Sequence, residues 1–375
     1  MLCGMLLDHY TKDEIASHVG SIMALIRAGR SREVLYNSLS LPDAHELVSI
    51  AVARIKDRKV KLPLLMNEDD LRFATNNLVA TWRAKRLSCK TIIEIGCGIG
   101  VQSIAFAKTC AKVIAIDTDA RKIRYAVENA KMMGVSNITF LCSDGVTFLE
   151  SLPMADTIFV DPQRLASEPV RSVETMQPSI SQLLHVAKQI TNSIAIELPP
   201  QVQLVPLHGE REYASVDHEL NRLTVYNGDL KHVDVSVVVL PSGDVLASNQ
   251  RLPQRKRLSA RFVYEPDPAV VKAGLIDAID IDILDYSGYT LFGSDNLIDS
   301  PFCKNIFKVL YRGAVNLGAI KSVLQDAGIG KVVLRTAVSP QDYWKQRKIY
   351  ESDLKGSKIV HLFLFDEALV CEKIN

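Results

Sequence analysis

The stretch that decides the fold is Thr91-Ile-Ile-Glu-Ile-Gly-Cys-Gly-Ile-Gly100, followed by a short helical segment and then by Val113-Ile-Ala-Ile-Asp117. It reads as an apolar strand, a glycine-rich turn, a helix and a second apolar strand that ends in an acid. This order of elements is typical of a parallel sheet that binds a nucleotide-type ligand beyond the carboxyl ends of its strands. The sequence therefore predicts an adenosine cofactor at this edge of a sheet.

The spacing of the glycines indicates which of two kinds of adenosine cofactor the sequence binds. Gly96, Gly98 and Gly100 follow a G-x-G-x-G pattern, whereas a dinucleotide-binding domain has G-x-G-x-x-G and would need glycine in place of Val101. Glu94 precedes the first glycine, and a carboxylate there suits an ammonium group better than a pyrophosphate. S-adenosylmethionine carries such a group at its methionine end. A dinucleotide-binding α/β domain stays open as the alternative.

The acid at the end of the second strand is predicted to bind a ribose. A carboxylate at the position of Asp117 can accept hydrogen bonds from both ribose hydroxyls. Each charge-assisted bond contributes about 1.5–3 kcal/mol, so this one acid can dominate ribose recognition.

At this point the sequence resembles the class I S-adenosylmethionine-dependent methyltransferases, and two further strand ends support the resemblance. Residues 137–142 and 156–160 read as a third and a fourth strand, followed by Ser143-Asp144 and by Asp161-Pro162. In that family an acid after the third strand faces the adenine amino group, and the motif after the fourth strand faces the substrate. The resemblance implies an α/β fold with a Rossmann-like sheet over roughly residues 85–240. The cofactor-binding residues that it implies are Glu94, Gly96, Cys97, Gly98, Gly100, Asp117, Thr118, Asp144, Gly145 and Asp161.

A narrower resemblance covers nearly the whole chain after residue 60. Tyr264–Leu275, the tail from Ser300 to Phe365, and Asn67–Thr75 look like segments of methyltransferases with a C-terminal THUMP-like domain. THUMP domains proper bind RNA in modification enzymes, so the resemblance implies an RNA substrate. The predicted regions are an N-terminal helical domain (1–85), the methyltransferase core (86–242), a basic linker and extension (243–299) and a small THUMP-like α+β domain (300–375).

The predicted catalytic residues are Asp161, Pro162 and Arg164. Methyl transfer is a direct displacement, so the enzyme must align a nucleophile and handle one proton. Amine-directed nucleic-acid methyltransferases place Asn or Asp, two prolines and an aromatic residue here. The first side chain and a backbone carbonyl accept hydrogen bonds from the exocyclic amine, and the aromatic ring stacks on the flipped base. In this chain Gln163 replaces the second proline, and Arg164, which can stack on a base or clamp a phosphate, replaces the aromatic residue.

Two other interpretations of this motif are open. Asp-Pro-x-Arg also resembles the motif of carbon-5 uridine methyltransferases, but those need a cysteine nucleophile in a later motif, and no matching cysteine is present. Alternatively, Asp161 only caps the following turn, and Arg164 pairs with Glu168 one helical turn later.

Charge and composition limit where an RNA could bind. The chain is 47% hydrophobic and 23% charged with a net charge of +1, which is ordinary for a soluble globular protein, so any basic surface must be local. Arg251–Arg261 holds five bases and no acid, and residues 301–375 carry twelve bases and seven acids. Tyr343, Trp344 and Tyr350 lie among bases, as is typical of stacking on single-stranded nucleotides. A solvated linker and a domain-packing face are the respective alternatives.

The first 88 residues predict helices. Thr11-Lys-Asp-Glu14 is a capping box before an amphipathic run over residues 15–26, and a second helix begins near Pro42. A third is expected to run from Asn67 to Arg86, with acids in its first turn and bases at its end, as suits the helix dipole. This region either scaffolds the core or takes part in its function.

The cysteines and the hydropathy indicate the cellular compartment of the protein and whether it binds a metal. The seven cysteines are scattered without a C-x-x-C pair, which predicts no zinc site and fits a reducing cytoplasm. The sequence contains no long uncharged apolar run of the kind that forms a signal peptide or a membrane span. Together with the resemblance, these features predict a cytoplasmic methyltransferase that acts on a tRNA or rRNA base and uses no metal. The alternatives are a methyltransferase of protein or small molecules, and a cofactor-binding RNA-binding protein with little activity.

Overall fold

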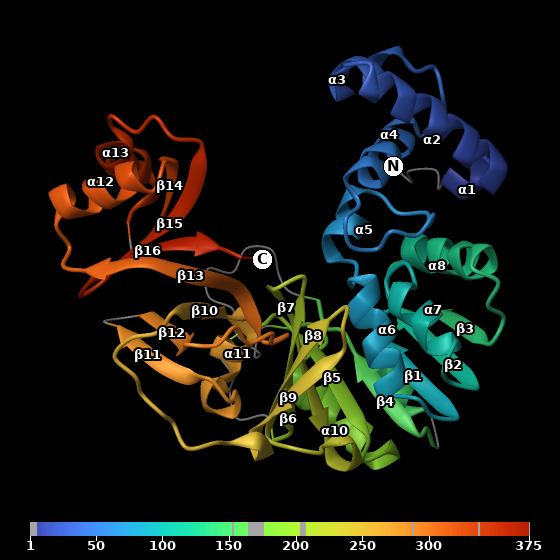
Figure 1. Ribbon diagram of the computed structural model, residues 1–375. Coiled ribbons are helices and arrows are strands. Elements are labelled where there is room, and N and C mark those ends of the chain that lie inside the picture. The colour runs from blue at the N-terminus through green and yellow to red at the C-terminus, as the bar shows by residue number, and fades with distance from the viewer. Residues whose placement is uncertain are drawn as a thin grey trace. The chain divides into compact units, whose positions relative to one another are not determined.

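The structure is a computed structural model that describes residues 6–151, 154–163, 176–202, 208–286, 289–336 and 338–374 (Figure 1). By packing, the chain divides into two compact units. The first holds Met1–Val216 and Asn221–Asp234, and the second holds Asp217–Leu220 and Val235–Asn375. The four predicted regions, with boundaries after residues 85, 242 and 299, remain predictions.

Six described helices precede the first strand of the sheet. They are α1 (Leu6–His9), α2 (Lys12–Arg27), α3 (Arg32–Ser38), α4 (Ala44–Lys56), α5 (Glu68–Phe73) and α6 (Asn77–Arg86). The predicted capping box is confirmed, since the Thr11 hydroxyl accepts a bond from the Glu14 N–H at 3.3 Å and the Thr11 N–H donates to the Glu14 carboxylate at 2.8 Å. Helix α3 was not predicted.

The prediction of one helix from Asn67 to Arg86 is wrong, because the chain forms the two helices α5 and α6 instead. The break falls at residues 74–76, where Asn76 takes an extended backbone and its side chain accepts a bond from the Leu78 N–H at 2.9 Å. An Asn side chain that bonds to the backbone in this way begins a new helix and competes with continuation of the old one. The break leaves Phe73 as the last residue of α5.

The first unit is built on a mixed sheet, in which its strands follow the order β3-β2-β1-β4-β5-β7-β6. Its strands β1 to β5 run parallel, and β7 is antiparallel to β5. The bounds are β1 (Thr91–Ile95), β2 (Lys112–Asp117), β3 (Ile138–Cys142), β4 (Thr157–Val160), β5 (Ile194–Leu198), β6 (Glu210–Val216) and β7 (Glu219–Asn227). The four strands predicted between Thr91 and Val160 are confirmed as β1 to β4. In the second unit, β8 (Val235–Leu240) pairs antiparallel with β9 (Asp244–Ala247).

The register of the parallel strands brings their ends to one level. Ile95 pairs with Ile116 of β2 and with Val160 of β4. The residues that follow these three positions therefore meet at the carboxyl edge of the sheet, where α/β folds bind ligands. The helices between these strands are α7 (Val101–Ala107), α8 (Ala120–Met132), α9 (Gly145–Glu150) and α10 (Ile180–Ile190).

The second unit contains a seven-stranded sheet in the order β11-β12-β10-β13-β16-β15-β14. The strands are β10 (Phe262–Pro266), β11 (Asp282–Tyr286), β12 (Tyr289–Ser294), β13 (Cys303–Gly313), β14 (Ile329–Arg335), β15 (Lys358–Leu364) and β16 (Ala368–Lys373). Its helices are α11 (Pro268–Ala273), α12 (Leu317–Asp326) and α13 (Pro340–Glu351). The sequence predicts a helix around residues 317–327, which matches α12, and strands at 331–336, at 359–365 and near Leu369, which match β14, β15 and β16. It does not predict α13 or β13. Within the described ranges, no helix is long and apolar enough to cross a membrane.

Candidate functional site

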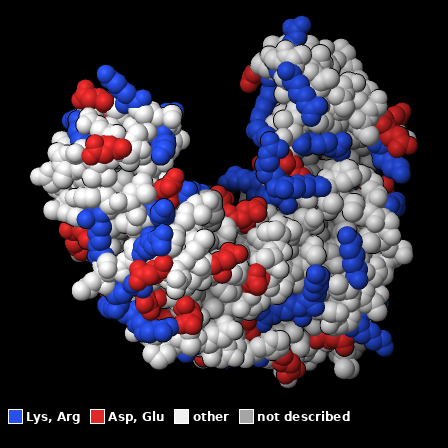
Figure 2. Space-filling model, in the orientation of Figure 1, with Lys and Arg blue, Asp and Glu red and all other residues white. Residues whose placement is uncertain are grey.

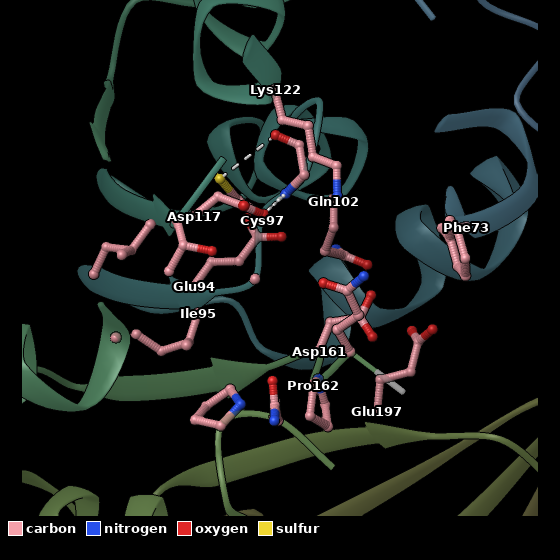
Figure 3. A pocket seen from close by; sticks show the side chains of 18 of the residues that line it. Phe73, Glu94, Ile95, Cys97, Gln102, Asp117, Lys122, Asp161, Pro162 and Glu197 are labelled. Atoms are coloured by element: carbon pink, nitrogen blue, oxygen red, sulfur yellow. Dashed lines mark hydrogen bonds between the residues drawn. The ribbon is translucent and has the colours of Figure 1, made fainter. Parts of the chain in front are cut away.

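A cavity of about 1250 Å³ opens at the carboxyl edge of β1, β2 and β4, within the first unit. Most of the residues predicted from the sequence line it, and Figure 3 shows several of them around the space. These are Glu94, Gly96, Cys97, Gly98, Asp117, Thr118, Asp144, Gly145, Asp161 and Pro162. Gly100 is not in the wall, and Arg164 and Glu168 lie outside the described residues.

The glycine loop allows two backbone segments to approach closely. Gly96 has a φ of +84°, and a Cβ there would lie 2.3 Å from the Asp161 carbonyl oxygen, which is too close for any side chain. Gly100 also has a positive φ and caps α7, and a Cβ there would lie 3.1 Å from the Ala126 Cβ of α8. The loop thus presents bare backbone to the cavity.

Asp117 holds the glycine loop in place from the end of β2. Its carboxylate accepts bonds from the Gly98 N–H at 2.8 Å and from the Asp119 N–H at 2.9 Å. Each carboxylate oxygen can accept two bonds, so capacity remains for a ligand hydroxyl. Asp144 is exposed in the same cavity, where its carboxylate accepts the Thr147 N–H at 2.9 Å and caps α9.

Glu94 lies deep in the cavity wall and is only 1% exposed. Burial raises the pKa of its carboxyl to about 8, although the Ser103 hydroxyl, which donates to it at 2.5 Å, opposes this shift. A buried carboxyl with this pKa is mostly neutral at pH 7. An ammonium group placed beside it would favour the charged form.

This shift predicts that cofactor affinity depends on pH. If Glu94 ionises to face the ammonium group of S-adenosylmethionine, binding releases a proton. The dissociation constant is then expected to fall about tenfold per pH unit as the pH rises toward 8. Calorimetry between pH 6 and 7 keeps the cofactor's α-amino group mostly protonated, since such groups have a pKa of about 7.7–8. Glu94→Gln should flatten the dependence, and an equal slope in both proteins would contradict the role of Glu94.

Asp161 and Pro162 follow β4 at the centre of the cavity wall. The Asp161 N–H donates to the Ile95 carbonyl at 2.9 Å, which fixes the motif to β1. The pKa of the Asp161 carboxyl is well above its usual value because the group is removed from water and lies near the Glu197 carboxylate. Figure 3 shows Asp161, Pro162 and Glu197 on the side of the cavity away from Asp117.

A buried ion-pair network beneath Asp161 was missed by the sequence analysis. Glu197 of β5 pairs with Arg83 of α6 and accepts a bond from Arg222 Nε of β7 at 2.6 Å. Burial alone would raise the pKa of Glu197, but the two guanidinium groups hold it below its usual value. The available signal was an acid inside an otherwise apolar strand, Ile-Ala-Ile-Glu-Leu, that ends next to β4.

The residues around the cavity fit S-adenosylmethionine. The bare glycine backbone leaves room that a side chain would fill. Asp117, Asp144 and Glu94 all line this space, and the sequence predicts them to face the ribose, the adenine amino group and the ammonium group, respectively. Among the described residues, no group of three or more His, Cys, Asp or Glu side chains could hold a metal ion.

The comparisons with known proteins agree with this geometry. A family model described as RNA cap guanine-N2 methyltransferase matches residues 89–242. An uncharacterized S-adenosylmethionine-dependent methyltransferase of Mycobacterium tuberculosis is 22% identical over 302 residues, which is 76% of this chain and 80% of that protein. A tRNA (uracil(54)-C(5))-methyltransferase of Schizosaccharomyces pombe is 35% identical over 78 residues, but these cover only 20% of this chain and 15% of that protein.

The whole chain also has a structural counterpart. A crystal structure of a putative methyltransferase from Porphyromonas gingivalis W83 superimposes with a TM-score of 0.73 and 15% identity, covering 98% of this chain and 100% of that one. The fold is therefore that of a class I methyltransferase. Relatives and cavity together support an S-adenosylmethionine-dependent methyltransferase.

Proposed function

We propose that this protein methylates an exocyclic amine of a base in RNA. The observation that carries the proposal is the position of Asp161-Pro162, which borders the cavity directly beyond β4. The family model that matches the core describes methyltransferases of guanine N2 in RNA caps, and that atom is an exocyclic amine. The protein is proposed to act in the cytoplasm, and its C-terminal region is proposed to be THUMP-like.

The proposed mechanism assigns Asp161 two tasks. When bound, S-adenosylmethionine supplies an electrophilic methyl group. The Asp161 carboxylate accepts a hydrogen bond from the amine and so orients the nitrogen lone pair. It also takes the proton that the amine loses as its new nitrogen–carbon bond forms. The raised pKa of Asp161 makes its ionised form a stronger proton acceptor than an ordinary aspartate.

The cysteines disfavour methylation of uridine at carbon 5, which requires a thiolate nucleophile. Cys97 is the only cysteine among the described residues that line the cavity. Burial holds the pKa of its thiol well above the usual value, so the thiol is neutral. The amine is therefore the better supported target.

Helix α13 of the second unit is proposed to bind RNA. None of its residues is buried, and Trp344 is 61% exposed with the Arg347 guanidinium 5.2 Å from its ring centroid. Lys345 and Lys348 are exposed on the same helix. Tyr343 and Tyr350, by contrast, pack partly against the core of this unit, so only one of the three aromatic residues is free to stack.

The basic stretch 251–261 is less suited to bind RNA. Four of its five bases form ion pairs with aspartates from residues 277–295, and Lys and Arg atoms alternate with Asp and Glu atoms around β11 in Figure 2. This pairing cancels most of the positive charge that phosphates would attract. We therefore assign these bases to packing within the second unit. The pairs are Arg251–Asp277, Arg255–Asp280, Lys256–Asp285 and Arg257–Asp295.

Replacing Lys345 and Lys348 together by alanine is expected to weaken RNA binding. Each lysine that neutralises a phosphate adds about 0.7 to the slope of log affinity against log salt for a single strand. In fluorescence anisotropy titrations, the salt dependence of binding by the double variant should therefore be less steep, with a slope smaller in magnitude by about 1.4. The matched control is Arg255→Ala with Lys256→Ala, which should leave the slope unchanged. The reverse pattern would place RNA on residues 251–261.

The proposed function is tested by transfer of radiolabelled methyl groups to deproteinised total RNA from cells that lack this protein. The wild-type protein should transfer radiolabel to the RNA, and the Asp117→Ala variant should not. Nucleoside mass spectrometry should then identify a methylated amine. Calorimetric binding of the cofactor without label in RNA would contradict an RNA substrate and favour a protein or a small molecule, and methylation at a ring carbon would contradict the amine.

A further inference from the structure

Phe73 is an apolar ring that faces the cavity instead of the core. Its sequence neighbours Leu71 and Ala74 pack against the hydrophobic core of the first unit. Phe73, in contrast, is 46% exposed and belongs to the cavity wall. Figure 3 shows it on the side of Gln102 and Asp161, across the cavity from Asp117. The ring therefore lies away from the residue placed for the cofactor ribose.

The helix that carries the ring is anchored. Helix α5 is fastened to α8 by Arg121, whose guanidinium donates to both oxygens of the buried Asp70 at 2.8 and 2.9 Å. The Arg72 guanidinium carbon lies 5.2 Å from the centroid of the Phe73 ring. An aromatic ring on an anchored helix is a rigid stacking platform, because little side-chain freedom is lost when a flat ligand binds.

A basic segment runs beside this platform. Residues 54–61 contain five bases and one acid. Lys56 pairs with Glu68, whereas Arg58 and Lys61 are exposed. Within this segment, the Lys59 ammonium donates to the Arg72 carbonyl and the Lys59 carbonyl accepts the Asn77 N–H, both at 3.0 Å. Figure 2 shows Lys and Arg gathered on the N-terminal helices. A positive surface next to an exposed ring is the combination that binds single-stranded nucleic acid.

We propose that Phe73 stacks on the RNA base that is methylated, and that residues 54–61 hold the phosphates beside it. The proposal rests on the function proposed above. It explains how the site can do without an aromatic residue in Asp161-Pro162-Gln163-Arg164. The stacking ring comes from the N-terminal helices, so these helices complete the substrate site.

The first test measures kinetics on total RNA. Phe73→Ala should lower kcat/KM by about 10- to 100-fold, the usual value of one base–aromatic stack. Phe73→Tyr should restore most of it, and the affinity for S-adenosylmethionine should stay unchanged. Leu25→Ala is the control, since Leu25 is also an exposed apolar residue but is not part of the cavity wall. A loss of cofactor affinity in Phe73→Ala, or unchanged kinetics, would overturn the proposal.

The second test needs no methyl transfer and so separates this proposal from the proposed function. Phe73→Trp is made together with Trp344→Phe, which removes the other exposed tryptophan. Guanosine and adenosine monophosphates should quench its fluorescence, whereas ribose 5-phosphate should not. The Trp344→Phe protein alone should show no such quenching. Absence of quenching in the double variant would overturn the stacking role even if wild-type protein labels RNA.

Discussion

Replacing Asp161 by alanine is expected to lower the rate of methyl transfer to RNA by about 10²- to 10⁴-fold, the usual contribution of one positioned acid–base group. The carboxylate lies near Glu197 and is removed from water, so its ionised form binds a proton strongly. The measurement is single-turnover transfer with saturating cofactor. Calorimetry should show that S-adenosylmethionine still binds.

Asp161→Asn separates the two tasks of this residue. Its amide oxygen still accepts a hydrogen bond from the target amine but cannot take up the proton. An intermediate rate is expected, which rises with pH as solvent hydroxide replaces the carboxylate. Full activity of Asp161→Ala would contradict the catalytic role and leave Asp161 as a cap of the following turn.

Replacing Arg83 by methionine is expected to lower the free energy of unfolding of the first unit by about 3–5 kcal/mol. Arg83 is 1% exposed, pairs with Glu197, donates to Gln102 at 2.7 Å and lies over the Phe159 ring. Its loss leaves a buried carboxylate without its main partner. Denaturant unfolding can be followed through Trp82 in a Trp344→Phe background, so that only the first unit is reported.

The control for this prediction is a double-mutant cycle. Arg83→Met with Glu197→Gln removes both charges and should be more stable than Arg83→Met alone. Arg222→Met should lower the free energy of unfolding by less than Arg83→Met does. The Arg222 side chain is 25% exposed, so water can replace its contact with Glu197. Additive effects of Arg83→Met and Glu197→Gln would show that the pair is not coupled.

The sequence predicts the parallel part of the sheet well, because each strand there has two recognisable features. One is an apolar run, and the other is a glycine or an acidic residue at the end of the strand. Gly96, Asp117 and Asp161 follow three strands that end level, so they also lie together in the structure. Helix α13 escapes prediction because it buries no residue and so lacks an apolar stripe.

The rest of the site depends on contacts that are distant in sequence. Arg83 looks like a base that suits a helix end, yet it is buried against Glu197, more than a hundred residues away. The ion pairs of residues 251–261 likewise form with aspartates that strand pairing brings near. Phe73 faces the cavity only because α5 ends there, and the Asn76 cap that ends it was not recognised.

The anchoring of α5 through Asp70 also limits where related sequences can carry insertions or deletions. Asp70 is the anchor, and Phe73 follows it within one helical turn. Because an α-helix rotates by about 100° per residue, one residue inserted between them would turn the ring out of the cavity. The same insertion between α3 and α4 would leave the ring in place. Insertions and deletions should therefore be common between α3 and α4 and rare between Asp70 and Phe73.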